Sequence, residues 1–429
     1  MRRVLMISPH FPPDSTAATH RVRLLAPYLS RYGWQPTVLT VDPRDYEGRL
    51  DPDLAASVPS DVRVIRTRAW PVSVSRVVGI GDLGLRAFHG LWREASGLLA
   101  REAFDAVFIT IYPAYPALLG PLLKRRFACA FVLDYQDPWV GEWGRSAGPL
   151  AGGRPDLKSR VSRFVASRME PYALRAADAV TAVSTATYEQ ALEHAPDARP
   201  RRCAEIPIGW DPGDLDRAGD GPPTFPDDGL IHLSYVGTLL PAGYDTLRAV
   251  LAALAELRAT DPAALKLRLH FFGTSNQRTL DAPLRVMPVA AEYGLSDVVT
   301  ERAVRLDYFE ALRVLRHSTA VLLLGSRERH YTPSKVFPAL IARRPVVAVF
   351  HDASNATDLL RRIGRAPTVR LVTYDGTTPP SRAAIASELS ALTAQPCYDP
   401  AAINDDVLAP FSACALAGRL AKVFDACRA

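Results

Sequence analysis

Short apolar runs alternate with longer segments of helical periodicity through the first half of the chain. Runs of this length, apolar almost throughout and separated by helix-length segments, are typical of strands in a parallel sheet that is covered on both faces. The pattern predicts these strands: RRVLMIS, PTVLTV, VRVIRT, DAVFITI, ACAFVLDY, DAVTAVS and AEIPIG. The first half is therefore expected to form a doubly wound α/β domain.

The segment from Asp211 to Gly229 interrupts this pattern. Its sequence, DPGDLDRAGDGPPTFPDDG, is crowded with Asp, Gly and Pro and supports neither periodicity, so it predicts a domain linker. The strand pattern then restarts with IHLSYVG, LKLRLHFFG, TAVLLLGS, PVVAVF and VRLVTY, separated by helical segments such as YDTLRAVLAALAEL and DYFEALRVLRH. We expect one Rossmann-like domain over residues 1–212, a linker over 213–228 and a second Rossmann-like domain over 229–409.

The carboxyl ends of the strands are where ligands bind in such sheets, so the residues that follow each strand are the first candidates for function. Two domains that face each other would enclose a cleft. The final stretch, SACALAGRLAKVFDAC, has apolar residues at helical spacing and predicts a terminal helix within residues 410–429. This helix would pack on one of the domains, and packing back on the first domain is one such arrangement.

Composition adds limits on the class of protein. A chain of 429 residues with 48% hydrophobic content is long enough for two full cores. Without a long apolar run or a signal-peptide pattern at the start, it is expected to be cytoplasmic. Five scattered cysteines suggest neither a disulfide framework nor a zinc site. The net charge of +6 favours anionic partners such as phosphates or acidic lipid headgroups, while nucleic acid is not favoured.

The stretch HYTPSKVFPALIARRPVVAVF reads as a loop, a helix and a buried strand. A helix N-terminus at this edge of the sheet is a ready anion site, and Lys335 adds a full charge that suits a diphosphate. Pro338 would be costly if the helix were capped at Thr332, so we favour a cap at Ser334, which leaves Pro338 in the fourth helical position. The alternative is that residues 330–335 form a solvated loop before a core helix.

Five motifs then resemble, in chain order, those of retaining glycosyltransferases with the two-domain GT-B fold, of the family 4-like kind. They are SPHFPP followed by HRVRLLAPYLSRYGWQPTVLT, then VLDYQDPW, IPIGWDP, LSYVGTLLPAG, and PSK followed by RPVVAVF. Each motif is weak alone, but together they cover nearly the whole chain. The resemblance implies transfer of a sugar from a nucleoside-diphosphate sugar to an acceptor hydroxyl, with retained configuration and no obligatory metal or other cofactor.

Two departures from the family pattern affect the predicted donor site. The Glu that commonly holds the nucleotide ribose is replaced by Pro338, and its usual partner carboxylate falls on His330. The glycine loop reads GTLLPAGYD, without the Arg and Lys that usually follow the glycine. The charge of the leaving diphosphate must then be met elsewhere, and the nearest cations in sequence are Lys335, Arg327 and Arg329.

The resemblance assigns roles to residues at these motifs. Lys335 would stabilise the leaving diphosphate and Asp137 would orient the acceptor or the sugar. The other donor-site candidates are Gly237, Thr238, Arg327, Glu328, His330, Tyr331, Thr332 and Ser334. The acceptor and cleft candidates are His10, Arg21, Asp134, Tyr135 and Trp139. Each has an ordinary structural alternative, such as a surface lysine, a turn cap or packing in the wall of a domain.

The helix expected over residues 86–104 leaves a further question open. Its apolar stripe and dispersed arginines would suit a membrane surface and a lipid-linked acceptor, which would place the protein at the inner membrane face, but a helix that covers the first sheet is the more common arrangement. The acceptor is a sugar, a lipid-linked glycan or a small molecule. A sugar-nucleotide epimerase and a non-catalytic sugar-nucleotide sensor or scaffold are the alternative functions, because the fold hosts all three.

Overall fold

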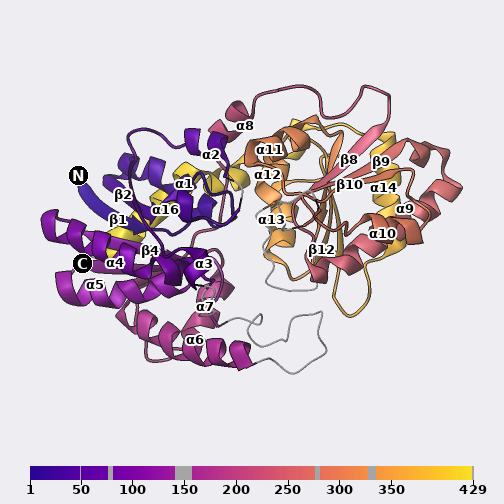
Figure 1. Ribbon diagram of the computed structural model, residues 1–429. Helices are drawn as coiled ribbons and strands as arrows, with labels where there is room; N and C mark the ends of the chain where they lie inside the picture. The colour runs from indigo at the N-terminus through magenta and orange to yellow at the C-terminus, as the bar shows by residue number, and fades with distance from the viewer. Residues whose placement is uncertain (49, 76–80, 141–156, 276–280, 327–334, 428–429) are drawn as a thin grey trace. The chain divides into compact units, whose positions relative to one another are not determined.

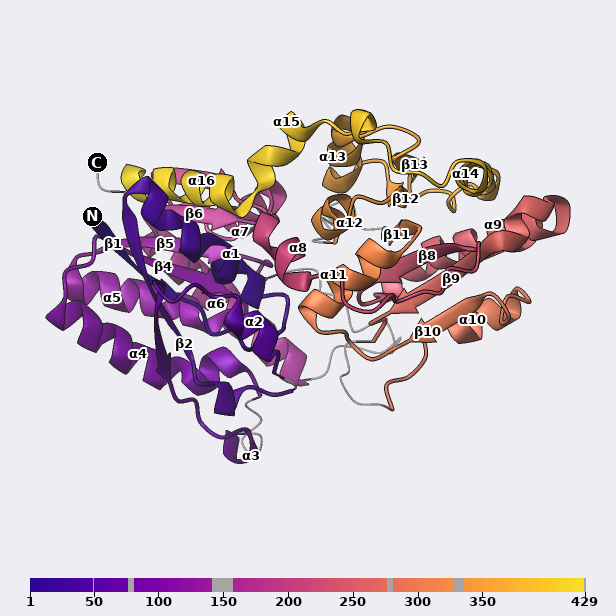
Figure 2. The same ribbon diagram turned by 90° about the horizontal axis from the view of Figure 1, so that it is seen from above.

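The computed structural model describes residues 1–48, 50–75, 81–140, 157–275, 281–326 and 335–427 of the 429-residue chain (Figure 1). The chain divides into two compact units. The first contains residues 1–209 and 411–429, and the second contains residues 210–410. The end of the chain therefore returns to the first unit, as the yellow C-terminal helix among the indigo N-terminal elements shows in Figures 1 and 2.

The first unit is built on a seven-stranded parallel sheet of order β3-β2-β1-β4-β5-β6-β7. Its strands are β1 (Arg2–Ile7), β2 (Trp34–Val41), β3 (Arg63–Thr67), β4 (Ala106–Ile111), β5 (Ala130–Tyr135), β6 (Ala179–Ala182) and β7 (Arg202–Glu205). The predicted last strand AEIPIG is misplaced, since β7 ends at Glu205. The N–H of Ile206 still donates to the carbonyl of Ala182, but Pro207 has no N–H group to extend the ladder.

Helices cover both faces of this sheet. They are α1 (Thr19–Leu29), α2 (Pro52–Ala56), α3 (Val72–Ser75), α4 (Leu83–Arg101), α5 (Leu119–Phe127), α6 (Leu157–Ala176), α7 (Thr185–Glu193) and, from the end of the chain, α16 (Ala413–Ala426). Apolar residues of α1 and α16 share one core with the sheet, and those of α4 to α7 share the core on its other face. The first half of the chain is thus doubly wound, as the sequence predicts.

The apolar stripe of α4 belongs to this second core. Leu91 is fully buried, and Phe88, Trp92 and Leu99 pack against the same cluster. Of the two interpretations of residues 86–104, the helix that covers the sheet is therefore the one observed, and the stripe is not available for a membrane surface. No helix within the described ranges has the length and apolar character needed to span a membrane.

The second unit is built on a six-stranded parallel sheet of order β10-β9-β8-β11-β12-β13. Its strands are β8 (Ile231–Val236), β9 (Leu267–Phe272), β10 (Val299–Arg302), β11 (Ala320–Leu324), β12 (Val346–His351) and β13 (Val369–Tyr374). The sequence pattern misses β10. This edge strand reads VTER and buries only its first residue, so it lacks the apolar run that marks the other strands.

The helices of the second unit are α8 (Pro212–Ala218), α9 (Tyr244–Thr260), α10 (Met287–Glu292), α11 (Tyr308–His317), α12 (Val336–Ile341), α13 (Asn355–Ile363), α14 (Arg382–Ala394) and α15 (Asp405–Leu408). The helix α8 lies within the segment in which the sequence shows neither periodicity. Asp211 caps it, and the hydroxyl of Tyr308 donates to the buried Asp214 at 2.9 Å, which ties α8 to α11. A short capped helix has too few residues to show a period.

Pro338 lies in the first turn of α12. Lys335 is the N-cap rather than the predicted Ser334, so Pro338 is the third helical residue. The first helical bond runs from the N–H of Ala339 to the carbonyl of Lys335 at 3.2 Å. No intrahelical bond is lost, because the first four N–H groups of a helix have no intrahelical partner. Phe337, Leu340 and Ile341 are buried, as their spacing predicts.

Candidate functional site

The carboxyl end of β8 carries the glycine loop. Gly237 has a φ of +129°, and its N–H donates to the carbonyl of Phe272 at 2.8 Å. A Cβ at this position would lie 2.4 Å from Cε and 3.0 Å from Nζ of Lys335. Glycine is therefore required twice, for its backbone conformation and for the space that the lysine side chain occupies. The structure brings Gly237, Thr238 and Lys335 together, although Lys335 lies far from the loop in sequence.

The ammonium group of Lys335 is held by two acceptors. It donates to the hydroxyl of Tyr235 at 2.6 Å and to the carbonyl of Thr238 at 2.8 Å. It also lies 4.6 Å from the centre of the Tyr235 ring. The residue as a whole is partly exposed. Burial of its ammonium group, with a smaller contribution from the charge of Arg305, lowers the pKa of Lys335 to about 7.

Arg285 is a further cation at this loop that the sequence analysis does not identify. Its Nη1 donates to the carbonyl of Leu239 at 2.7 Å. The backbone around it is fixed by Glu301, which accepts from the N–H groups of Arg285, Val286 and Met287, each at 2.9 Å. Arg285 follows neither a strand nor a recognisable motif, so its position depends on the folded loop before α10.

Six of the predicted donor-site residues lie outside the described residues. They are Arg327, Glu328, His330, Tyr331, Thr332 and Ser334. Their assignment to the nucleotide sugar stays a prediction.

Arg21 and Asp134 have another role than the predicted contact with phosphate or acceptor. Both are buried, and they form a two-pronged ion pair with Nε–Oδ2 and Nη2–Oδ1 distances of 2.9 and 2.5 Å. Thr181 donates to the same carboxylate at 2.5 Å, and Arg21 also donates to the carbonyl of Ile206. The pair joins α1, β5, β6 and the segment after β7. The two charges neutralise each other inside the first unit. This corrects the prediction that Arg21 and Asp134 contact the phosphate, the sugar or the acceptor.

Tyr135 and Trp139 belong to the wall of the first unit. Tyr135 is fully buried in the core on the α4 face, so the predicted stacking on a sugar is wrong for this residue. Trp139 is only partly buried, and its ring meets that of Tyr115 edge-on at 5.6 Å between centres. Its backbone N–H donates to the buried carboxylate of Glu170 at 3.2 Å. Trp139 therefore keeps an accessible aromatic surface after β5.

His10 and Asp137 are at least partly accessible at this edge. The carboxylate of Asp14 accepts a hydrogen bond from Nδ1 of His10 at 2.8 Å and another from the Thr19 hydroxyl at 2.8 Å. The imidazole lies 6.1 and 6.0 Å from the rings of Tyr46 and Tyr112. These contacts orient His10 at the end of β1.

Asp137 is exposed as a residue, yet the protein atoms near its carboxylate raise its pKa to about 6 by desolvation. Because the residue is exposed, water stabilises the negative charge of the carboxylate and opposes this rise in pKa. On either basis Asp137 is ionised at neutral pH, and it can accept a hydrogen bond from a hydroxyl group.

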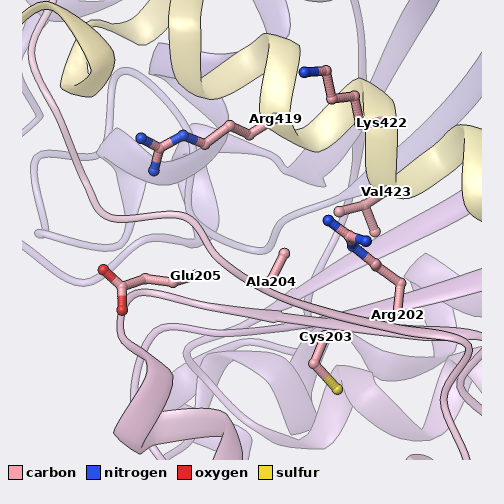
Figure 3. A pocket seen from close by; sticks show the side chains of 7 residues that line it. All are labelled: Arg202, Cys203, Ala204, Glu205, Arg419, Lys422 and Val423. Atoms are coloured by element: carbon pink, nitrogen blue, oxygen red, sulfur yellow. The ribbon is translucent and has the colours of Figure 1, made fainter.

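Two cavities of the described residues are formed elsewhere, one in each unit. One, of about 340 Å³, is lined by β7 and α16, and Figure 3 shows Arg202, Arg419 and Lys422 around it. Another, of about 540 Å³, lies beside the end of α13 and residues 402–406. Neither contains a predicted site residue. The described part of the chain holds no group of three or more side chains suited to a metal ion.

Comparison with known proteins finds a domain match for part of the chain and a shared fold for nearly all of it. Residues 16–209 match the model of the Glycosyl transferase 4-like domain. The fold is similar to sucrose-phosphate synthase from Thermosynechococcus elongatus, with a TM-score of 0.63 and 18% identity over 99% of this chain and 98% of that chain. A sequence comparison with curated proteins finds no match.

Two further solved structures share the fold. HepE of Anabaena, in complex with UDP, has a TM-score of 0.55 and 14% identity over 98% of this chain and 95% of that chain. The E. coli trehalose-6-phosphate protein bound with UDP-2-fluoro glucose has a TM-score of 0.58 and 12% identity over 100% and 99%. Residues 16–209 are therefore similar to the Glycosyl transferase 4-like domain, and the chain shares the two-domain α/β fold of these solved structures.

Proposed function

We propose that the protein transfers a sugar from a uridine-diphosphate sugar to an acceptor hydroxyl, with retained anomeric configuration, in glycan, glycolipid or specialised-metabolite biosynthesis. The observation that carries the proposal is the meeting of Lys335 with the Gly237–Thr238 loop. Uridine is proposed as the base because two proteins of similar fold were solved with UDP or a UDP-sugar. The retention of configuration rests on the resemblance of the five motifs.

The chemistry requires a site that stabilises a departing diphosphate. Preorganised cations and N–H groups supply most of the stabilisation of such charge in enzymes. Lys335 and Arg285 both reach the glycine loop, where they donate to the carbonyls of Thr238 and Leu239. They would provide the positive charge that the loop sequence GTLLPAGYD itself lacks. On this proposal, Arg285 replaces the family's loop arginine from a different part of the chain.

The acceptor is proposed to bind at the carboxyl end of the first sheet. His10, Asp137 and Trp139 follow β1 and β5 there, and the half-exposed Tyr112 follows β4. Aromatic faces and hydrogen-bonding groups are what sugar rings need for binding. A sugar, a lipid-linked glycan or a small molecule with a free hydroxyl would fit this chemistry. We place the reaction in the cytoplasm and propose that it needs no bound metal.

The first experiment is a thermal-shift screen with uridine, guanosine, adenosine and thymidine diphosphates. A ligand at a hundred times its dissociation constant adds about 2.7 kcal/mol to the stability, which raises the midpoint by a few degrees. We expect a shift with uridine diphosphate and a smaller one or none with the others. The absence of any shift would contradict the proposed donor site and favour a scaffold function or a different donor.

Transfer is then tested with UDP-sugars and a panel of sugar, lipid-linked and small-molecule acceptors. The expected result is release of uridine diphosphate that depends on the acceptor and that a chelator leaves unchanged. The anomeric proton coupling in the product, measured by NMR, decides between retention and inversion. A new sugar nucleotide formed from the donor alone would instead indicate an epimerase.

A further inference from the structure

Tyr235 lies beside the proposed donor site, and neither the motifs nor the proposed function explains its presence there. It lies on β8 and is almost fully buried, at 3% exposure. Its ring lies below the ammonium group of Lys335 at 4.6 Å, and its hydroxyl accepts from that group at 2.6 Å. The same hydroxyl donates to the carbonyl of Thr238 at 2.9 Å. Tyr235, Lys335 and Thr238 therefore form a closed hydrogen-bonded triangle beside Gly237.

The triangle fixes the direction of each hydrogen bond. A tyrosine hydroxyl has one proton, and Thr238 receives it, so the lone pairs of the oxygen are left to face Lys335. An ammonium group has three protons. Tyr235 and Thr238 accept two of them, and no other described residue accepts the third. One N–H of a fixed cation is thus left for an anionic ligand at the glycine loop.

We propose that Tyr235 is a positioning residue that holds Lys335 over Gly237 in its protonated form, ready to meet the diphosphate of the donor. This inference rests on the proposed function, because it names how the same site keeps its cation. The hydroxyl lone pair and the ring face both favour the ammonium over the neutral amine. Burial and the nearby charge of Arg305 act in the opposite direction. Tyr235 therefore offsets part of the desolvation that a cation suffers in this place.

The test is the substitution Tyr235→Phe, which keeps the ring and removes the hydroxyl. Without that acceptor, Lys335 should lose its proton at a lower pH. Binding of uridine diphosphate to the neutral lysine requires uptake of a proton, so the loss of affinity should grow with pH. We expect almost no change below pH 6 and roughly a tenfold weaker affinity at pH 8.5, as for one hydrogen bond to a charged group.

Calorimetric titration at both pH values measures this effect. The ratio of the dissociation constants of the variant and the wild type removes the contribution of the nucleotide's own protonation, which is the same for both proteins. In the Lys335→Met background, Tyr235→Phe should have no further effect, because a positioning residue acts only through the group that it positions. Tyr398→Phe is the matched control, because Tyr398 lies at the opposite end of the same sheet. The backbone of its neighbour Asp399 is hydrogen-bonded there to the hydroxyl of Thr368. An equal loss at both pH values, or in the Lys335→Met background, would overturn the proposal.

A second measurement needs no nucleotide and separates this inference from the proposed function. The chain has only five lysines, so carbon-13 labelling of lysine Cε gives few NMR signals, and Lys335→Arg assigns the one of interest. The titration midpoint of Lys335 should fall by about one pH unit in Tyr235→Phe, the equivalent of a tenfold change. An unchanged midpoint would refute the role of Tyr235 even if nucleotide binds. A shifted midpoint without any nucleotide binding would refute the donor site but keep the coupling.

Discussion

The carboxyl ends of the two sheets use their charged residues in different ways. In the first unit, Arg21 and Asp134 are buried and neutralise each other. In the second unit, Lys335 is held only by a hydroxyl and a carbonyl, which leaves its positive charge without a counter-ion among the described residues. A charged residue at a strand end is thus a candidate for ligand binding only when the fold has not already neutralised it. The following predictions test this difference.

The largest effect is expected from Asp134→Asn. The amide removes the negative charge and leaves the buried guanidinium of Arg21 without its partner. Loss of one member of a buried ion pair costs about 3–5 kcal/mol of unfolding free energy. We therefore expect a fall of several degrees in the thermal midpoint, measured by calorimetry, with the affinity of the folded protein for uridine diphosphate unchanged.

Asp197→Asn is the matched control for that experiment. Asp197 pairs with Arg175 at 2.7 Å, but the side chains are 61% and 50% exposed. Exposed pairs contribute about 0–1 kcal/mol, so this variant should unfold almost like the wild type. If Asp134→Asn were as stable as its control while nucleotide affinity fell, the pair would have to be assigned to ligand binding after all.

Lys335→Ala should have the reverse profile. Loss of the Lys335 ammonium group should lower kcat/KM by about a hundredfold or more. This is the effect of removing one preorganised hydrogen-bond donor to a developing negative charge. Stability at neutral pH should change little, because the ammonium is desolvated and its removal relieves that cost. Steady-state kinetics and thermal unfolding together decide this prediction. A comparable loss of stability and activity would make Lys335 a structural residue.

The pH dependence of stability gives an independent check on Lys335. Its pKa is lowered from 10.5 to about 7 in the folded protein, mainly by burial. Between these values the unfolded chain binds a proton that the folded protein does not, so stability rises with pH in this window. Lys335→Ala should lack that part of the rise, as measured by denaturant unfolding from pH 7 to 10.

The sequence predicts the strands better than it predicts the interactions of the residues at their carboxyl ends. Long apolar runs such as LLL in β11 leave little choice of structure, while the polar β10 and the short α8 give no periodic signal. The side-chain partners are harder to predict, because they come from distant parts of the chain. Asp134 and Arg21 are separated by 113 positions, and Lys335 and Tyr235 by 100. No local pattern reports such a contact.

Arg285→Gln tests the cation that the sequence does not reveal. The substitution removes the charge but keeps a group that can donate to the carbonyl of Leu239. We expect roughly tenfold weaker binding of uridine diphosphate, the effect of one hydrogen bond to a charged group. Arg268→Gln is the control, because Arg268 also donates to carbonyls, those of Leu265 and Leu267, but near the start of β9. Equal titration curves for both variants would exclude Arg285 from the donor site.

The smallest effect is expected from Pro338→Glu, which restores the carboxylate of the family pattern. Pro338 is the third residue of α12, where an acidic side chain is compatible with the positive end of the helix and no helical bond changes. If the ribose site is merely without its usual acceptor, the new carboxylate should tighten nucleotide binding by a few-fold, corresponding to about 0.5–1.5 kcal/mol for one hydrogen bond. Pro338→Gln separates the charge from the shape of the side chain. Weaker binding of the Glu variant, measured by calorimetric titration, would mean instead that another group of this protein already occupies the place of that carboxylate.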